Sequence, residues 1–234
     1  IWNGVVMGGG VGLSLYGDHR LATSNTKFAM PETAIGFFPD VGGSYFLSNL
    51  PGNFGKYIAL TSEILTINEL LFFGLATHYY EHNEVENIKD RFINNGEILN
   101  KKYEVSNDSY IIKNINLISN IFSGNIHDII ENLKNNDSDF SKKILEKLSK
   151  KCPMSLAITT KLIENANGKS LKECLEIEFQ LSQKIVYRDD FDNGVNSVLV
   201  SKDHNPKWDP PNIDEINVDD LDKYFETHTE KLYL

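Results

Sequence analysis

Short apolar runs alternate with glycines and polar residues over the first third of the chain. Apolar runs of this length, bounded by Gly, Asp or Asn, are typical of buried strands. They predict strands over 4–7, 20–23 and 27–30. Between the first two, the glycines at 8–10 lead into residues 11–15, whose apolar spacing is helical. A buried strand that feeds directly into a helix predicts a layered α/β architecture.

The signals that follow are mostly those of helix ends. Thr66 and Glu69 form a capping-box pattern before an apolar run. Gly74 suits the position just after that helix, where a positive φ is common. Residues 77–80 predict one more short strand.

Two longer helices are predicted near the C-terminal end of the sequence. Pro153 fits the first turn of a helix that runs through Asn165. Ser170 and Glu173 form a second capping box, which opens another helix. The apolar residues of that helix are predicted to lie largely on one face. They are Leu171, Leu175, Ile177 and Leu181.

The composition divides the chain into three segments. Residues 1–80 hold most of the glycines, residues 81–150 are rich in Asn, Lys and Ile, and residues 151–234 are amphipathic and acidic. We therefore predict a core region over 1–80 that carries the motifs described below. A helical segment over 81–150 and a C-terminal helical region over 151–234 follow it.

The overall composition excludes several classes of protein. Hydrophobic residues make up 41% and charged residues 24%, which is ordinary for a globular protein and not for a disordered one. No apolar run approaches the roughly 18 to 20 residues that a membrane-spanning helix needs. The net charge of -10 argues against nucleic acid as the main partner, because phosphate contacts need a basic face. Cys152 and Cys174 are too few for a disulfide scaffold and indicate a reducing compartment.

The glycine turn Gly8–Gly10 has two interpretations. Consecutive glycines at a helix start let backbone N–H groups approach a ligand closely. Such donors can stabilise a carbonyl oxygen that becomes negative in the transition state. Alternatively, the glycines serve only the close packing of a helix on a strand. The glycines by themselves do not decide between these two.

Three other kinds of site fit the sequence poorly. In a dinucleotide fingerprint the third glycine would fall on Leu13 or Leu15. Residues 168–170 have the tail of a phosphate-binding loop but lack its leading glycine. His78 and His82 have no convincing third ligand, so no metal is predicted.

Two carboxylates, Glu32 and Asp40, lie in an apolar stretch that is punctuated by Gly and Pro. Apolar surroundings raise carboxyl pKa values, and when two carboxyls lie close together their pKa values move apart. Such a pair can divide into an acid and a base or nucleophile. The alternative is that Asp40 caps a helix beginning at Val41 while Glu32 is exposed to solvent.

The combination of these features resembles the crotonase (enoyl-CoA hydratase/isomerase) superfamily, and within it the branch of 3-hydroxyisobutyryl-CoA hydrolases. Residues 7–13 (MGGGVGL) and 28–47 (FAMPETAIGFFPDVGGSYFL) carry most of the resemblance. The second motif is specific, whereas the triple glycine alone is not. Shorter stretches at 59–61, 74–78, 153–156, 190–195 and 202–208 extend the resemblance to most of the chain.

The resemblance implies an α/β crotonase-like fold of stacked ββα units with a helical C-terminal region. It also implies hydrolysis of a CoA thioester, most specifically 3-hydroxyisobutyryl-CoA in valine degradation. The N–H of Gly9, flanked by Gly8 and Gly10, would donate to the thioester oxygen. Glu32 would act as nucleophile or as general base, and the residues leave these two open. Asp40 would orient substrate or water and manage the proton.

Departures from the family pattern bear on the choice of reaction. Hydratases of the superfamily carry an acid where this chain has Gly12, and usually Gly where it has Asp40. Hydrolysis is therefore favoured over an enoyl-CoA hydratase or isomerase reaction. A non-catalytic subunit that binds acyl-CoA is the other alternative. The family's acid and arginine near the C-terminal end are Asn193 and Asn196 here.

CoA is anionic, so an acidic chain must bind it through local basic groups. Lys202 and Lys207 are candidates by family position, although solvated surface lysines are an equal interpretation. No cofactor is expected, because CoA is part of the substrate. The expected partner is a small acyl-CoA molecule, with no nucleic acid or membrane, and a homo-oligomer stays open. Family resemblance places the protein in mitochondria.

The chain begins at Ile1 directly before the glycine turn. In the family, several ββα units precede that turn, together with a second oxyanion N–H and much of the adenine pocket. We therefore expect a longer protein of which this is the later part. We also expect these residues alone to have little or no activity.

Overall fold

The computed structural model describes residues 1–98, 103–227, 230 and 232, and it divides the chain into two compact units. One unit combines residues 1–29 with 64–115, and the other combines 30–63 with 116–234. Each unit therefore draws on two separate stretches of the chain. The three segments predicted above follow composition, whereas these units follow contacts.

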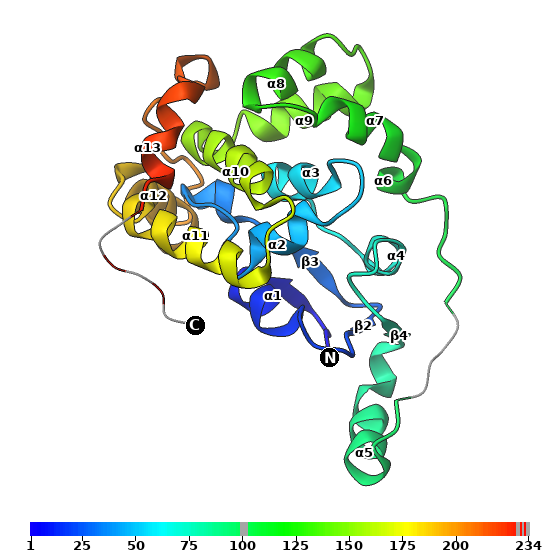
Figure 1. Ribbon diagram of the computed structural model, residues 1–234. Coiled ribbons are helices and arrows are strands. Elements are labelled where there is room, and N and C mark those ends of the chain that lie inside the picture. The colour runs from blue at the N-terminus through cyan, green and yellow to red at the C-terminus, as the bar shows by residue number, and fades with distance from the viewer. Residues whose placement is uncertain (99–102, 228–229, 231, 233–234) are drawn as a thin grey trace. The chain divides into compact units, whose positions relative to one another are not determined.

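The first unit contains two pairs of short parallel strands (Figure 1). Strand β1 (Val5–Met7) pairs with β3 (Lys27–Ala29), and β2 (Leu21–Thr23) pairs with β4 (His78–Tyr80). All the strands predicted from the sequence are confirmed to within one residue at each end. Most side chains of β2 and β3 are buried in the core of this unit, where Ala22 and Phe28 are 0% exposed, whereas Val5 of β1 is exposed.

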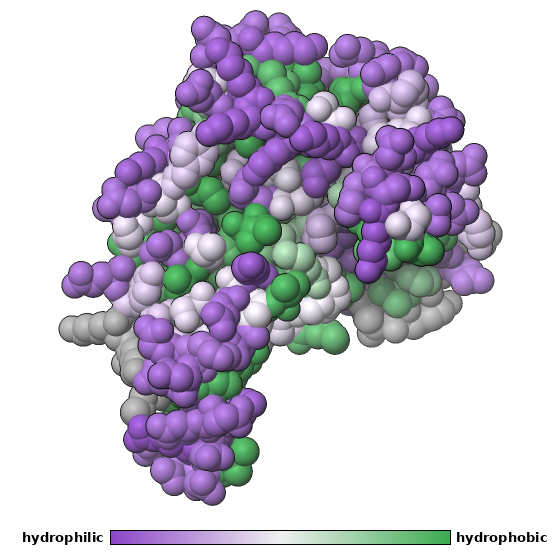
Figure 2. All heavy atoms as spheres, turned by 180° about the vertical axis from the view of Figure 1, so that it is seen from behind, coloured by the Kyte–Doolittle hydropathy of each residue, from purple (hydrophilic) through white to green (hydrophobic). Residues whose placement is uncertain are grey.

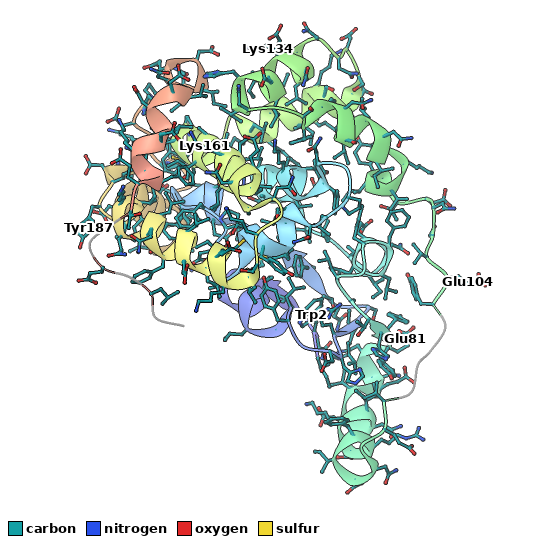
Figure 3. The ribbon with its side chains drawn as sticks, in the orientation of Figure 1. Trp2, Glu81, Glu104, Lys134, Lys161 and Tyr187 are labelled. Carbon is teal, nitrogen blue, oxygen red and sulfur yellow. The ribbon has the colours of Figure 1, made fainter. Side chains whose placement is uncertain are left out.

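Trp2 ties the glycine turn to the strands of this unit (Figure 3). Its indole Nε1 donates to Ser14 Oγ at 2.8 Å, and Ser14 Oγ donates to the Gly10 carbonyl at 2.6 Å. The Trp2 ring also lies 5.6 Å from the Phe28 ring. The helix that begins at the glycines is thus held to the start of the chain by specific contacts.

The helices of the first unit confirm the predicted start and stop signals. Thr66 N donates to Glu69 Oε2 at 2.9 Å in a complete capping box, and Gly74 has a φ of 68° after the helix. The bounds are α1 (Gly9–Ser14), α4 (Ile67–Phe72), η2 (His82–Glu84), α5 (Val85–Asn95) and α6 (Tyr110–Lys113).

Helix α5 turns one apolar side toward the strands. Its Ile88 joins Leu21 and Tyr80 in a buried cluster. At the lower left of Figure 2, the remaining surface of α5 is mostly hydrophilic, with some hydrophobic residues at its end. This is the pattern expected for an amphipathic helix on the surface of a core.

The second unit is helical and is organised around α10 (Pro153–Ala166), which contacts η1 (Glu32–Ile35), α2, α3 and α8 (Figure 1). Pro153 stands in the first turn as predicted. Residues on all sides of α10 are buried, which is typical of a helix inside a core. The other elements are α2 (Gly43–Ser48), α3 (Phe54–Thr61), α7 (Ile115–Ile121), α8 (Ile126–Lys134), α9 (Asp139–Leu148), α11 (Leu171–Ile185), α12 (Asp189–Val195), η3 (Asn196–Val200), η4 (Ile213–Glu215), η5 (Val218–Leu221) and α13 (Asp222–Phe225).

The capping box of α11 is confirmed, but the predicted buried face is wrong in part. Of the four apolar residues predicted to share that face, Leu181 alone is fully buried. The buried stripe instead runs through Cys174, Glu178, Leu181 and Ile185. The prediction failed because a buried acid stands where the pattern would place an apolar residue.

No helix in the described part of the chain is long and apolar enough to cross a membrane.

Two glycines, Gly36 and Gly194, let the backbones of α12 and η1 pack directly against each other. A Cβ on Gly194 would lie 2.4 Å from the Ile35 carbonyl carbon, and one on Gly36 would lie 2.3 Å from the Asp190 carbonyl oxygen. Gly36 also has a φ of 74°, which disfavours other residues. The Phe37 and Phe191 rings pack 5.3 Å apart beside this crossing. The position of η1 therefore depends on glycine on both sides.

We expect Gly194→Ala to lower the free energy of unfolding by about 1–3 kcal/mol, because the added methyl group overlaps the Ile35 backbone, which cannot change rotamer as a side chain could. Urea unfolding measures the change in the free energy of unfolding. Gly17→Ala is the matched control, since a Cβ there lies 3.6 Å from the Ser14 carbonyl oxygen, an ordinary contact. Equal stability of the two variants would contradict the close packing of α12 on η1.

Candidate active site

Glu32 begins the short 3-10 helix η1 and is buried, with 5% of its surface exposed. Its carbonyl oxygen accepts from Phe37 N at 3.1 Å, and the Thr33 carbonyl accepts from Cys152 N at 3.0 Å. These backbone bonds fix η1 beside the start of α10. Neither oxygen of the Glu32 carboxyl has a hydrogen-bond partner within the described residues. The carboxyl is therefore held in place by its backbone, and its two oxygens are buried without a partner among the described residues.

Burial, together with the negative charges of Asp40 and Glu178, raises the pKa of Glu32 to about 8. The backbone N–H of Glu32 and the Lys151 ammonium act in the opposite direction. A carboxyl with a pKa near neutrality can both take up and release a proton under working conditions. The sequence alternative, a solvent-exposed Glu32, is wrong because the apolar stretch around it folds inward.

Asp40 lies on a turn that leads into α2. The Asp40 carbonyl accepts from Gly43 N at 2.7 Å, and the two residues between them have positive φ, 54° at Val41 and 82° at Gly42. Helix α2 begins at Gly43 with Gly42 as its N-cap residue and no side-chain cap. The alternative that Asp40 caps a helix from Val41 is therefore wrong. Burial raises the pKa of the partly exposed Asp40 carboxyl.

Glu178 is a third acid of this site, and the sequence reasoning missed it. From α11 its carboxyl accepts from Gly42 N at 2.7 Å, from Ser44 N at 2.9 Å and from Ser44 Oγ at 2.6 Å. Burial raises its pKa to about 6, although these three donors act in the opposite direction. An acid within the apolar stripe of an amphipathic helix was the available signal.

The charge of Lys151 acts on Glu32 and lowers its pKa. Its ammonium donates to Ser62 Oγ at 2.7 Å. Burial, together with the positive charge of Lys147, lowers its pKa to about 8, although the charges of Glu32 and Glu63 act in the opposite direction. A partly buried lysine beside a buried acid offsets some of the cost of ionising that acid.

The glycine turn belongs to the other unit. Gly8 has a φ of 51° and precedes α1, so this position requires glycine. Added Cβ atoms at Gly9 and Gly10 would meet nothing within 4 Å. Close packing therefore does not explain these two glycines, and within the described residues the Gly9 N–H donates no hydrogen bond. The ligand-binding interpretation of these glycines stays a prediction.

The predicted CoA-binding lysines lie on the surface. Lys202 and Lys207 are both exposed, and the Lys207 carbonyl accepts from Asn193 Nδ2 at 3.1 Å. Their role stays a prediction. Among the described residues, no group of three or more His, Cys, Asp or Glu side chains is placed to hold a metal ion.

The second unit thus brings together Glu32, Asp40, Glu178 and Lys151. Glu178 has its hydrogen bonds satisfied by the protein, whereas the Glu32 carboxyl has none among the described residues. Environments that differ in this way separate the roles of neighbouring acids. Such a site can supply a nucleophile or base at Glu32 and a second proton carrier at Asp40.

Comparisons with known proteins give a consistent result. A family model described as enoyl-CoA hydratase/isomerase matches residues 1–225. The mitochondrial 3-hydroxyisobutyryl-CoA hydrolase of Dictyostelium discoideum is 44% identical over 240 residues, which are 96% of this chain and 62% of that protein. The corresponding protein of Xenopus tropicalis is 40% identical over 237 residues, again 62% of its length. The chain therefore spans about 62% of the length of these relatives.

Solved structures show the fold. A carnitinyl-CoA dehydratase from Mycobacterium thermoresistibile has a TM-score of 0.87 at 30% identity, covering 97% of this chain and 67% of that one. An enoyl-CoA hydratase from Rhodobacter sphaeroides has a TM-score of 0.88 at 23% identity, covering 96% and 66%. The crotonase-like α/β fold predicted from the sequence is confirmed.

The burial of Glu32 predicts a pH dependence of stability. An unfolded glutamic acid ionises at its ordinary pKa of 4.5, whereas folded Glu32 has a pKa of about 8. The unfolded chain therefore binds fewer protons between these values, and stability falls as pH rises through this window. We expect Glu32→Gln to lose less unfolding free energy than wild type between pH 5 and 9. The difference should reach a few kcal/mol, at about 1.4 kcal/mol for each pKa unit.

Urea unfolding at several pH values measures this difference. Comparing the two proteins cancels the titration of Asp40 and Glu178 to first order. Glu176→Gln, on a partly exposed side of α11, removes the same charge and should follow wild type. Parallel curves for wild type and Glu32→Gln across this range would show that Glu32 is not buried.

Proposed function

Because the chain belongs to the enoyl-CoA hydratase/isomerase family, we propose that it carries the catalytic acids of a hydrolase for 3-hydroxyisobutyryl-CoA. The products would be 3-hydroxyisobutyrate and CoA, a step of valine degradation. One observation carries the proposal. The Glu32 carboxyl is buried, its pKa is raised in part by the charge of Asp40, and neither of its oxygens has a hydrogen-bond partner among the described residues. The names of the relatives, at 36% to 44% identity, support this substrate.

In the proposed reaction the thioester carbonyl carbon is attacked and its C–S bond breaks. The Gly9 N–H donates to the carbonyl oxygen as it becomes negative, with Gly8 and Gly10 keeping the backbone accessible. Glu32 either attacks the carbon to form an anhydride or removes a proton from the attacking water. Asp40 orients the substrate or water and returns a proton to the departing thiolate.

Hydration of an enoyl thioester is less well supported. In the family that reaction uses an acid at the position of Gly12, and here this position on α1 has no side chain. A non-catalytic acyl-CoA-binding subunit is also less well supported. Burying Glu32 without a partner costs stability, and a binding module gains nothing from that cost.

Other features of the proposal follow from the substrate and the relatives. The reaction consumes the thioester and water alone, so it needs no added cofactor. Exposed Lys202 and Lys207 would contact the anionic CoA moiety. The mitochondrial names of the relatives support a mitochondrial location.

A thioesterase assay on the full-length protein tests the function. The protein is mixed with several acyl-CoAs and a reagent that detects free thiol. We expect thiol release with a preference for 3-hydroxyisobutyryl-CoA. Release from no thioester would favour the binding module, and hydration of an enoyl-CoA without thiol release would favour the hydratase.

Glu32→Gln should lower the rate of thiol release by about 10²- to 10⁴-fold, the usual contribution of a positioned acid or base. Glu176→Gln is the control for charge and should keep the wild-type rate. Near wild-type hydrolysis by a folded Glu32→Gln protein would remove Glu32 from the mechanism.

A single turnover in ¹⁸O-labelled water distinguishes the two roles of Glu32. Hydrolysis of an anhydride at the enzyme carboxyl carbon leaves the label in Glu32. Direct attack by water places the label in the acid product alone. Mass spectrometry of the peptide that contains Glu32 reads out the difference, with Glu178 as the internal unlabelled carboxyl.

A further inference from the structure

The turn that carries Asp40 is strained. Val41 has a φ of 54° and Gly42 a φ of 82°, and the Asp40 carbonyl accepts from Gly43 N at 2.7 Å. Positive φ at both central residues suits Gly or Asn, whereas a β-branched residue there is an outlier. Such strain persists only where the surrounding structure fixes the backbone. Something outside the turn must therefore hold it.

Glu178 makes the contacts that can do so. Its two carboxyl oxygens accept from Gly42 N at 2.7 Å and from Ser44 N at 2.9 Å, one on each side of Gly43. Ser44 Oγ adds a third hydrogen bond at 2.6 Å. Glu178 is 3% exposed, so these charge-assisted bonds are shielded from water. The residues joined are 134 and 136 positions apart in sequence, so the contact is entirely tertiary.

We propose that Glu178 is a positioning residue that clamps the strained turn and thereby fixes Asp40 for the reaction. This inference rests on the proposed function for its activity readouts. Glu178 does not touch the substrate in this scheme. It acts through the backbone of Gly42 and Ser44, which lie two and four residues after Asp40 in the chain.

The charge of Glu178 has a second effect that separates clamping from simple stabilisation. The acids that interact with it are Asp40 on the turn and Glu32 on η1, while Cys174 lies on its own helix and Lys151 interacts with Glu32. The negative charge of Glu178 raises the pKa of Glu32. Removing that charge should lower the pKa at which Glu32 ionises, in addition to loosening the turn.

Two substitutions of Glu178 in the full-length protein distinguish the effect of its side-chain length from the effect of its charge. Glu178→Gln keeps the length but presents an amide N–H₂ to backbone donors, so one hydrogen bond is lost. We expect kcat to fall about 10- to 100-fold, with KM changing less, and the acidic limb of the pH profile to move to lower pH. Glu178→Asp keeps the charge but is too short to bridge both N–H groups. The kcat of Glu178→Asp should fall by a similar factor, while the acidic limb of its pH profile should stay at the wild-type pH.

Glu176→Gln, on the same helix and two residues away, should match wild type in kcat and in the pH profile. Wild-type kinetics in both Glu178 variants would overturn the inference. So would equal losses with no difference in the acidic limb, because that result would show a purely structural role. If Glu178→Gln fails to fold, Glu178→Asp and its combination with Val41→Gly still decide.

A double-mutant cycle with Val41→Gly tests the strain directly. Glycine adopts a positive φ without cost, so the turn of the Val41→Gly variant needs less clamping. We expect the loss in kcat from Glu178→Asp to be at least about 3-fold smaller in the Val41→Gly background. Losses that simply multiply would show that Glu178 does not oppose strain at Val41.

Hydrogen exchange of the Gly42 and Ser44 amides gives a readout that needs no activity. Both amides should exchange at least about 10-fold faster in Glu178→Gln than in wild type, while amides of α5 keep their rates. A wild-type protein without thioesterase activity would overturn the proposed function and leave this measurement to decide the clamp. An active wild type with unchanged Gly42 and Ser44 exchange in the variant would overturn the clamp alone.

Discussion

The buried Glu32 carboxyl is the constraint on which the site depends. An acid without a hydrogen-bond partner inside a protein is expensive, so the structure around it must hold it from the backbone. The Cys152 N–H to Thr33 carbonyl bond and the close approach of α12 at Gly36 and Gly194 do this. The result is a carboxyl fixed in position whose oxygens meet no partner among the described residues.

Glu178 is buried as deeply as Glu32, but the two carboxyls differ in their hydrogen bonding. Three donors from Gly42 and Ser44 satisfy Glu178, and its pKa rises only to about 6. The Glu32 carboxyl meets no donor side chain in the described part of the chain, and its pKa rises to about 8. The hydrogen bonds thus distinguish an acid that the protein satisfies from one that it leaves without a partner among the described residues. Lys151 offsets part of the charge that Glu32 would acquire on ionisation.

Local signals in the sequence predicted the local structure well. The capping pairs Thr66–Glu69 and Ser170–Glu173 and the first-turn Pro153 are satisfied within a few residues, so their effect does not depend on the fold. The buried face of α11 and the turn at Asp40 depend on Glu178, whose partners lie 134 and 136 positions away. No periodicity reports such a contact. The Glu32 and Asp40 motif was recognisable from resemblance, but the burial of Glu32 needed the structure.

Glycine illustrates the same limit, because one residue type serves two physical needs here. At Gly36 and Gly194 an added Cβ would collide with backbone atoms at 2.3 and 2.4 Å, so close packing requires glycine at both positions. At Gly9 and Gly10 the space is open and the Gly9 N–H makes no bond among the described residues. Packing gives no reason to exclude a side chain there. The function proposed above supplies a reason, because a thioester oxygen that accepts from the Gly9 N–H would need this open approach to the backbone.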